Sequence, residues 1–187
     1  MPHLDSVSEQ SRIIQAVNTV TVDEKGRLTG HNTDWIGVVQ SLTEAGVNLR
    51  QKTAVVLGAG GAGRAAVYGL LEGGIQKVIL MNRSTDKGKT AAGDLGAEFM
   101  PLTLLPDALA EADILISCVP GSEAVVPPSL LKRELVVMEA DYRRSPLLGE
   151  ALRKGCLAVS GKKWLFNQAL PAFKLMAGMD PPDISPS

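Results

Sequence analysis

The alternation of hydrophobic and polar positions changes along the chain near residue 52. From there on, continuous apolar runs of strand length alternate with segments of helical pattern. Apolar runs rich in β-branched residues are typical of strands that are covered on both faces. Strands are predicted at 53–57, 77–81, 112–117, 134–140 and 156–160, with a weaker one at 97–100. Helices are predicted at 61–72, 86–95, 104–111, 146–154 and 163–176. This order predicts an α/β fold with a doubly wound, Rossmann-like parallel sheet.

The first part of the chain has a different pattern. Segments 16–22 and 27–32 have the pattern of short strands and are joined by a polar turn that ends in glycine, which predicts a β-hairpin. A helix is predicted over 34–45, with Thr33 or Asp34 as its N-cap. We therefore expect three parts: a hairpin with a linking helix, a sheet domain with a C-terminal helix, and a disordered tail, over 1–45, 46–178 and 179–187.

Composition and charge narrow the class of protein. The 187 residues carry a formal net charge of −1, without the basic excess expected of a nucleic-acid surface. The sequence has no apolar run of membrane-spanning length. The two histidines and two distant cysteines form no metal-binding pattern, and Cys118 and Cys156 lie in apolar stretches typical of buried, reduced thiols. We expect a cytoplasmic protein with no nucleic-acid, membrane or metal role.

A glycine-rich loop follows the first strand of the predicted sheet. Gly58, Gly60 and Gly63 form the pattern G-x-G-x-x-G at the mouth of a helix, and Ala59, Gly61 and Ala62 complete the loop. Such a loop lets backbone N–H groups approach a pyrophosphate. Glycine turns also follow strands for packing alone, but the position at the first strand–helix junction favours a dinucleotide site.

The end of the second predicted strand indicates which dinucleotide. An NAD site usually has an acidic residue there to bind the ribose, whereas this chain has Asn82. Arg83 and Lys87 supply positive charge for a 2′-phosphate, and Ser84 adds a hydroxyl group. The alternative is that the two cations are solvated surface charges. The missing acid and the present arginine together favour NADP as the cofactor.

Short motifs in a fixed order give a more specific indication. "VNT" (17–19) and "NTD" (32–34) precede "GAGGAGRAA" (58–66), and "SPLL" (145–148) and "NQAL" (167–170) follow it. With these motifs the chain resembles the shikimate dehydrogenase family, including its quinate variants, over about residues 12 to 178. Methylenetetrahydrofolate dehydrogenases and glutamyl-tRNA reductases have a related cofactor domain, but the VNT and NTD pair argues against them.

The resemblance implies an activity and a set of site residues. The reaction would be the NADPH-dependent reduction of 3-dehydroshikimate to shikimate, a small-molecule substrate. By this resemblance Asn18 and Gln168 bind substrate, and Asp34 is the catalytic aspartate. Local sequence alone favours a helix N-cap for Asp34, a role that is compatible with the catalytic one. The implied cofactor site also includes residues that follow later strands: Ser117, Val119 and Gly161.

This sequence departs from the family at several places. The segment "SCVPGSEAVVP" (117–127) replaces a stretch of the Asn-Ala-Thr-Pro type, so contacts there are approximate. Trp164 stands at a methionine-like position, where its ring either covers the nicotinamide or fills the core. His31 is either a ligand contact or, with more support, a structural histidine.

The lysine that donates the proton in the family lies upstream of VNT and has no counterpart here. We therefore expect the chain to be the NADP-binding portion of the enzyme, inactive by itself, as a fragment or as a naturally shortened protein. It would then pair with a separate N-terminal substrate domain or form a homodimer. The alternative is a catalytically silent NADP- or metabolite-binding module that regulates a partner. The sequence leaves the oligomeric state and the choice between shikimate and quinate open.

Overall fold

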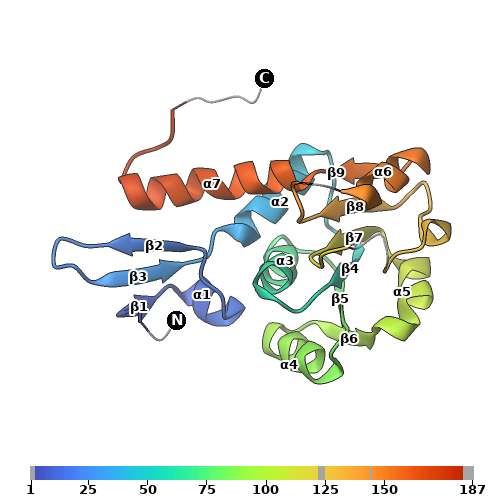
Figure 1. Ribbon diagram of the computed structural model, residues 1–187, viewed down its shortest axis with the longest axis horizontal. Coiled ribbons are helices and arrows are strands. Elements are labelled where there is room, and N and C mark those ends of the chain that lie inside the picture. The colour runs from blue at the N-terminus through green and yellow to red at the C-terminus, as the bar shows by residue number, and fades with distance from the viewer. Residues whose placement is uncertain (1–2, 122–124, 144, 183–187) are drawn as a thin grey trace.

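The computed structural model describes residues 3–121, 125–143 and 145–182 of the chain. Its larger sheet has six parallel strands in the order β6-β5-β4-β7-β8-β9 (Figure 1). These strands are β4 (Thr53–Leu57), β5 (Lys77–Asn82), β6 (Glu98–Pro101), β7 (Ile114–Ser117), β8 (Val136–Glu139) and β9 (Leu157–Val159). The predicted Rossmann-like α/β fold is confirmed, including the weak strand β6.

Helices cover both faces of this sheet. On one face pack α2 (Asp34–Glu44), α3 (Gly61–Glu72), α4 (Thr85–Leu95) and α7 (Gly161–Ala177). On the other face pack α5 (Leu105–Glu111) and α6 (Pro146–Arg153), with short 3-10 turns at η1 (Leu102–Leu104) and η3 (Pro128–Leu130). Successive residues of β4 are fully buried on opposite faces, with Val55 in one core cluster and Val56 in the other. Each such side chain contributes about 1.5–3 kcal/mol relative to an exposed one, so β4 is a central support of the sheet.

The strand order predicts a ligand-binding crevice at the carboxyl ends of the central strands. From β4 the chain moves outward to β5 and β6, and from β7 it moves to β8 and β9 on the opposite side. The carboxyl ends of the neighbouring strands β4 and β7 therefore lie at the point where the strand order reverses. In open α/β sheets, ligands bind in the crevice at this point.

A second, smaller sheet precedes the first along the chain. The predicted hairpin is present as β2 (Thr19–Val22) and β3 (Leu28–His31), paired antiparallel. The structure adds two elements that the sequence pattern did not indicate: strand β1 (Ser6–Val7), parallel to β3, and helix α1 (Glu9–Ile14). Helix α7 contacts this sheet at β2 (Figure 1).

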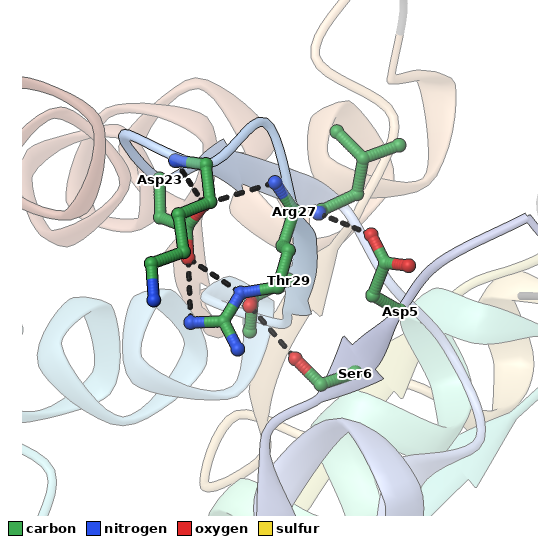
Figure 2. A network of polar contacts seen from close by, with 7 residues as sticks. Asp5, Ser6, Asp23, Arg27 and Thr29 are labelled. Carbon is green, nitrogen blue, oxygen red and sulfur yellow. Dashed lines mark hydrogen bonds and ion pairs between the residues drawn. The ribbon is translucent and has the colours of Figure 1, made fainter.

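Polar contacts fix the hairpin turn and the added strand. The Asp23 carboxylate accepts the N–H groups of Lys25 and Arg27 at 2.9 Å and forms an ion pair with the Arg27 guanidinium at 2.8 Å (Figure 2). The Asp5 carboxylate accepts the N–H of Leu28 at 2.7 Å, beside a Ser6–Thr29 hydroxyl pair (Figure 2). These contacts hold β1 against β3.

Element ends differ from the predictions by a few residues. Helix α7 begins at Gly161 instead of 163, because the Ser160 hydroxyl caps it by accepting the Lys162 N–H at 3.1 Å. Thr33 is the N-cap of α2, and Asp34 is the first residue of the helix. Of the tail expected to be disordered, 183–187 lie outside the described residues, and Asp180 forms an ion pair with Lys174 at 2.7 Å. The predicted part boundaries at 45 and 178 stay a prediction.

Candidate functional site

The glycines at the junction of β4 and α3 meet three different requirements. Gly58 has a φ of +102°, and a Cβ there would lie 2.9 Å from Val119 Cγ1. A Cβ at Gly63 would lie 1.8 Å from the Gly58 carbonyl oxygen, so only glycine lets α3 begin this close to the strand. A Cβ at Gly60 would meet nothing within 4 Å. The loop is therefore tightly packed at Gly58 and Gly63, and open to solvent at Gly60.

The open side of this loop suits an anionic group. Gly60 is exposed and is the N-cap of α3, with no side-chain cap. The first turn of α3 contains no acidic residue. The N–H groups of a helix's first turn have no partner within the helix and favour phosphate. The residues present thus fit the pyrophosphate of a dinucleotide.

Asn82 braces the loop from the end of β5. Its side-chain carbonyl oxygen accepts the Ala59 N–H at 3.2 Å, and its amide nitrogen donates to the Ser84 carbonyl oxygen at 2.9 Å. An ionised aspartate would accept the first bond but has no proton to donate to the second. An asparagine at this position therefore stabilises the loop through both of its amide atoms, in addition to its predicted effect of favouring NADP over NAD.

A cavity of about 260 Å³ lies beside the loop. It brings together four of the predicted cofactor residues, Gly58, Asn82, Arg83 and Val119. Arg83 is exposed, and so are Ser84, the N-cap of α4, and Lys87 in its first turn. The polar and cationic groups predicted to read a 2′-phosphate thus lie around the start of α4, and Arg83 among them lines the cavity.

Two amide side chains from distant parts of the chain meet beside the N-cap of α2. The Asn18 amide nitrogen donates to Thr33 Oγ1 at 3.1 Å and to Gln168 Oε1 at 3.3 Å. Thr33 Oγ1 in turn donates to Gln168 Oε1 at 2.9 Å. Thr33 was not predicted as a site residue, although it lies inside the NTD motif. The hairpin, α2 and α7 thus contribute one residue each to this group.

Asp34 faces a smaller cavity of about 140 Å³ next to these amides. Its lining includes Gln168, Trp164, Tyr142 and Ala62. Burial raises the pKa of the Asp34 carboxyl, and a hydrogen bond from Asn18 opposes that shift. The N-cap of α2 is Thr33, so the Asp34 carboxyl does not cap the helix and faces the cavity, which supports a role other than capping.

Trp164 fills the core, one of the two roles that the sequence allowed, and its contact with a nicotinamide stays a prediction. Its ring is 4% exposed and packs where a Cβ at Gly37 would come within 2.8 Å of Cδ1. Its Nε1 donates to the Asp34 carbonyl oxygen at 3.0 Å, and the side chain also lines the cavity. His31 forms a 3.1 Å hydrogen bond with the Thr21 hydroxyl inside the hairpin, which supports the structural reading of this histidine.

Two other predicted cofactor residues are buried. A Cβ at Gly161 would come within 2.6–2.8 Å of three carbonyl oxygens at the end of β8 and just after it, so glycine is needed for α7 to start beside the smaller cavity. Ser117 is fully buried at the end of β7, and its hydroxyl has no hydrogen-bond partner among the described residues. Its contact with a cofactor stays a prediction. Residues 122–124 of the following loop lie outside the described part of the chain.

Two other kinds of site are not found in the described residues. No helix in this part of the chain is long and apolar enough to cross a bilayer. The same residues contain no cluster of three potential metal ligands. Both cysteines are free.

Comparisons with known proteins identify the family. The family model described as shikimate / quinate 5-dehydrogenase matches residues 39–144. The NADP(+) shikimate dehydrogenase of Alkaliphilus oremlandii is 36% identical over 94% of this chain and 67% of its own length. The shikimate dehydrogenase of Thermus thermophilus, solved with NADP(H) and shikimate, has a TM-score of 0.84 and 34% identity over 97% of this chain and 69% of that one.

A quinate dehydrogenase has a closely similar structure. The enzyme of Corynebacterium glutamicum, solved with NAD, has a TM-score of 0.87 and 31% identity over 97% of this chain and 70% of that one. The chain spans about two thirds of the length of the relatives that it matches. The chain belongs to the shikimate / quinate 5-dehydrogenase family.

Proposed function

We propose that this chain is the NADP(H)-binding portion of a shikimate dehydrogenase. The observation that carries the proposal is the position of the glycine loop and the start of α3 between the two cavities. Gly58, the first residue of the loop, lines the cavity beside Arg83, and Ala62, in the first turn of α3, lines the cavity beside Asp34. A dinucleotide with its pyrophosphate at this helix start would extend one end toward each cavity.

The 2′-phosphate is the feature that would distinguish NADP from NAD at this site. Arg83, Ser84 and Lys87 offer a guanidinium, a hydroxyl and an ammonium group beside the larger cavity. The A. oremlandii relative is named as an NADP(+) enzyme, whereas the quinate dehydrogenase was solved with NAD. The absence of an acid at Asn82 favours NADP, because a carboxylate there would repel the phosphate.

The substrate side is built from neutral amides and one carboxyl group. When bound, the nicotinamide supplies or accepts the hydride of the reaction. The Asn18 and Gln168 amides would hold substrate hydroxyl groups, as each can donate and accept. Asp34, with its raised pKa, would hold or orient a proton near the reacting carbonyl group. Shikimate or quinate would therefore lie against the Asn18–Thr33–Gln168 group.

Turnover by these 187 residues alone should be low. The described residues that line the smaller cavity include no lysine or histidine, and its titratable side chains are Asp34 and Tyr142. A positioned general acid contributes about 10²–10⁴-fold to a rate. Two amides would also fix the substrate only loosely, and a near-attack distance of about 3–3.5 Å requires tight positioning.

Calorimetric titration of the chain with NADP+ and with NAD+ tests the cofactor half of the proposal. Tighter binding of NADP+ is the expected result, and no binding of either at millimolar concentration would contradict it. A spectrophotometric assay of NADP+ reduction with shikimate, and separately with quinate, tests the substrate half. We expect little turnover. Robust turnover that disappears in Asp34→Asn would show that this chain carries a complete active site.

A further inference from the structure

A polar link joins the start of the chain to the helix that carries the glycine loop. Arg64 lies in α3, one residue after Gly63, and its side chain is 10% exposed. Its Nε donates to the Ile14 carbonyl oxygen at 2.5 Å, and its Nη2 lies 3.0 Å from the Asp94 carboxylate in α4. One guanidinium group therefore ties the end of α1 to both α3 and α4.

The tied segment has a backbone that needs support. Gln15, the C-cap of α1, has a φ of 59° in the left-handed region, which is unusual for a residue other than glycine. Its side-chain amide donates to the same Asp94 oxygen at 3.1 Å. A strained residue persists where its surroundings over-determine it. Arg64 and Asp94 provide these surroundings, one through the preceding carbonyl and the other through the Gln15 side chain.

The segment leads directly from this link to the substrate side. The Ala16 methyl group packs on the start of α3, 3.3 Å from where a Cβ at Gly61 would lie. The Ala16 carbonyl oxygen accepts the Asn32 side-chain amide at 3.2 Å, and Asn32 Oδ1 accepts the N–H of Asp34 at 3.0 Å. Asn18 follows two residues after Ala16. The place of both Asn18 and Asp34 relative to the glycine loop thus depends on how 14–18 sits on α3.

We propose that Arg64 is a positioning residue that fixes segment 14–18 on α3 and thereby sets where Asn18 and Asp34 stand relative to the glycine loop. What these two residues bind rests on the proposed function, whereas the anchoring itself does not. A planar guanidinium can donate to a carbonyl and a carboxylate at once, which a lysine ammonium on a single stem does less well. A displacement of about 1 Å at a reacting centre can reduce a rate about 10²-fold.

Hydrogen exchange measured by mass spectrometry on the full chain tests the anchoring. Arg64→Met removes both bonds while keeping an unbranched stem, and Arg12→Met, at an exposed arginine of α1, is the matched control. In Arg64→Met we expect exchange to become about tenfold faster or more in 17–22 and 28–31, with protection of β4, β5 and β7 unchanged. Arg64→Lys should lie between the parent and Arg64→Met, and Arg12→Met should match the parent.

Ligand titration of the same variants separates positioning from cofactor binding. Shikimate affinity, measured with NADP+ present, should fall about tenfold in Arg64→Met, while NADP+ affinity stays within about twofold of the parent. Asp94→Asn replaces Arg64→Met as the test if the latter does not fold. It keeps Arg64 and should accelerate exchange in the same two strands to a smaller degree.

Two results would overturn the proposal. One is unchanged exchange in β2 and β3 of Arg64→Met or Asp94→Asn, and the other is an equal acceleration in both sheets, which would indicate a general loss of stability. If the parent binds neither NADP+ nor shikimate, the proposed function is contradicted, while the exchange measurement still decides the role of Arg64.

Discussion

Adding a single methyl group at two glycines of the same loop should have opposite consequences. At Gly60 the methyl group would point into open space, and the φ of −83° is ordinary for alanine. Replacing glycine by alanine lowers the conformational entropy of the unfolded chain, which stabilises the fold by about 0.4–1 kcal/mol. Alanine is a poorer helix N-cap than glycine, which costs a similar amount of stability. The stability of Gly60→Ala should therefore stay within about 1 kcal/mol of the parent. The methyl group would nevertheless occupy the space proposed for the pyrophosphate.

Gly63→Ala should instead destabilise the fold. Its Cβ would lie 1.8 Å from a backbone oxygen, where real Cβ contacts below 3.0 Å are essentially never found, so α3 must shift. Overpacking of this kind costs up to about 3 kcal/mol, and the better helix propensity of alanine returns about 1 kcal/mol. The net loss is about 2 kcal/mol, which for a chain of this size corresponds to a Tm lower by about 4–8 °C.

Thermal unfolding and calorimetric titration with NADP+ measure the two effects on the same samples. Gly60→Ala should unfold near the parent Tm and bind NADP+ at least about tenfold more weakly, a loss of about 1.4 kcal/mol. Parent-like NADP+ affinity in a folded Gly60→Ala would refute the assignment of the loop to the pyrophosphate. A Gly63→Ala variant as stable as the parent would refute the packing argument.

Three other substitutions test the two cavities. Arg83→Ala should remove most of the preference for NADP+ over NAD+, which is about 1.5–3 kcal/mol or ten- to a hundredfold in relative affinity. The control Arg50→Ala, which changes another exposed arginine, should leave the ratio of the two affinities unchanged. Because burial raises the pKa of Asp34 in the folded state, the parent loses stability as pH rises from the ordinary aspartate value through the raised one. Asp34→Asn should therefore be more stable than the parent above that window in urea unfolding and show no advantage below it. Trp164→Phe deletes the hydrogen bond to the Asp34 carbonyl oxygen and should cost about 1–2 kcal/mol of stability; an unchanged urea midpoint would contradict a stabilising role for this bond.

The sequence predicted the main sheet well because its signal is local. Five of its strands are continuous apolar runs, and the glycine pattern marks the first strand–helix junction. Strand β1 and helix α1 were missed for a physical reason. β1 has two residues and pairs with Thr29 and Gly30, far along the chain, while α1 is too short to show a helical period and depends on the Ser8 cap. Elements of this length are stabilised by tertiary contacts.

The candidate site was predictable in part. Asn18 and Gln168 are separated by 150 positions, so nothing local indicates that their side chains meet, and only the family resemblance paired them. Thr33 bonds to both, and Asn82 bonds to the Ala59 N–H and to the Ser84 carbonyl oxygen; these contacts depend on the tertiary structure. Arg64 stands out as a charge in an alanine-rich helix, but its partners lie 50 residues before it and 30 residues after it. Local periodicity carries no information about such partners.

Chemical-shift mapping by NMR of the isotope-labelled chain with NADP+ tests the central claim most directly, because it locates the cofactor residue by residue. We expect the largest changes at 58–63, at 82–84 and Lys87, and at the end of β7, with smaller changes around Asp34. Addition of NAD+ should leave the changes near Arg83 weaker. Changes confined to other surfaces, or none at a saturating millimolar concentration, would contradict the assignment of this loop and its two cavities to the dinucleotide.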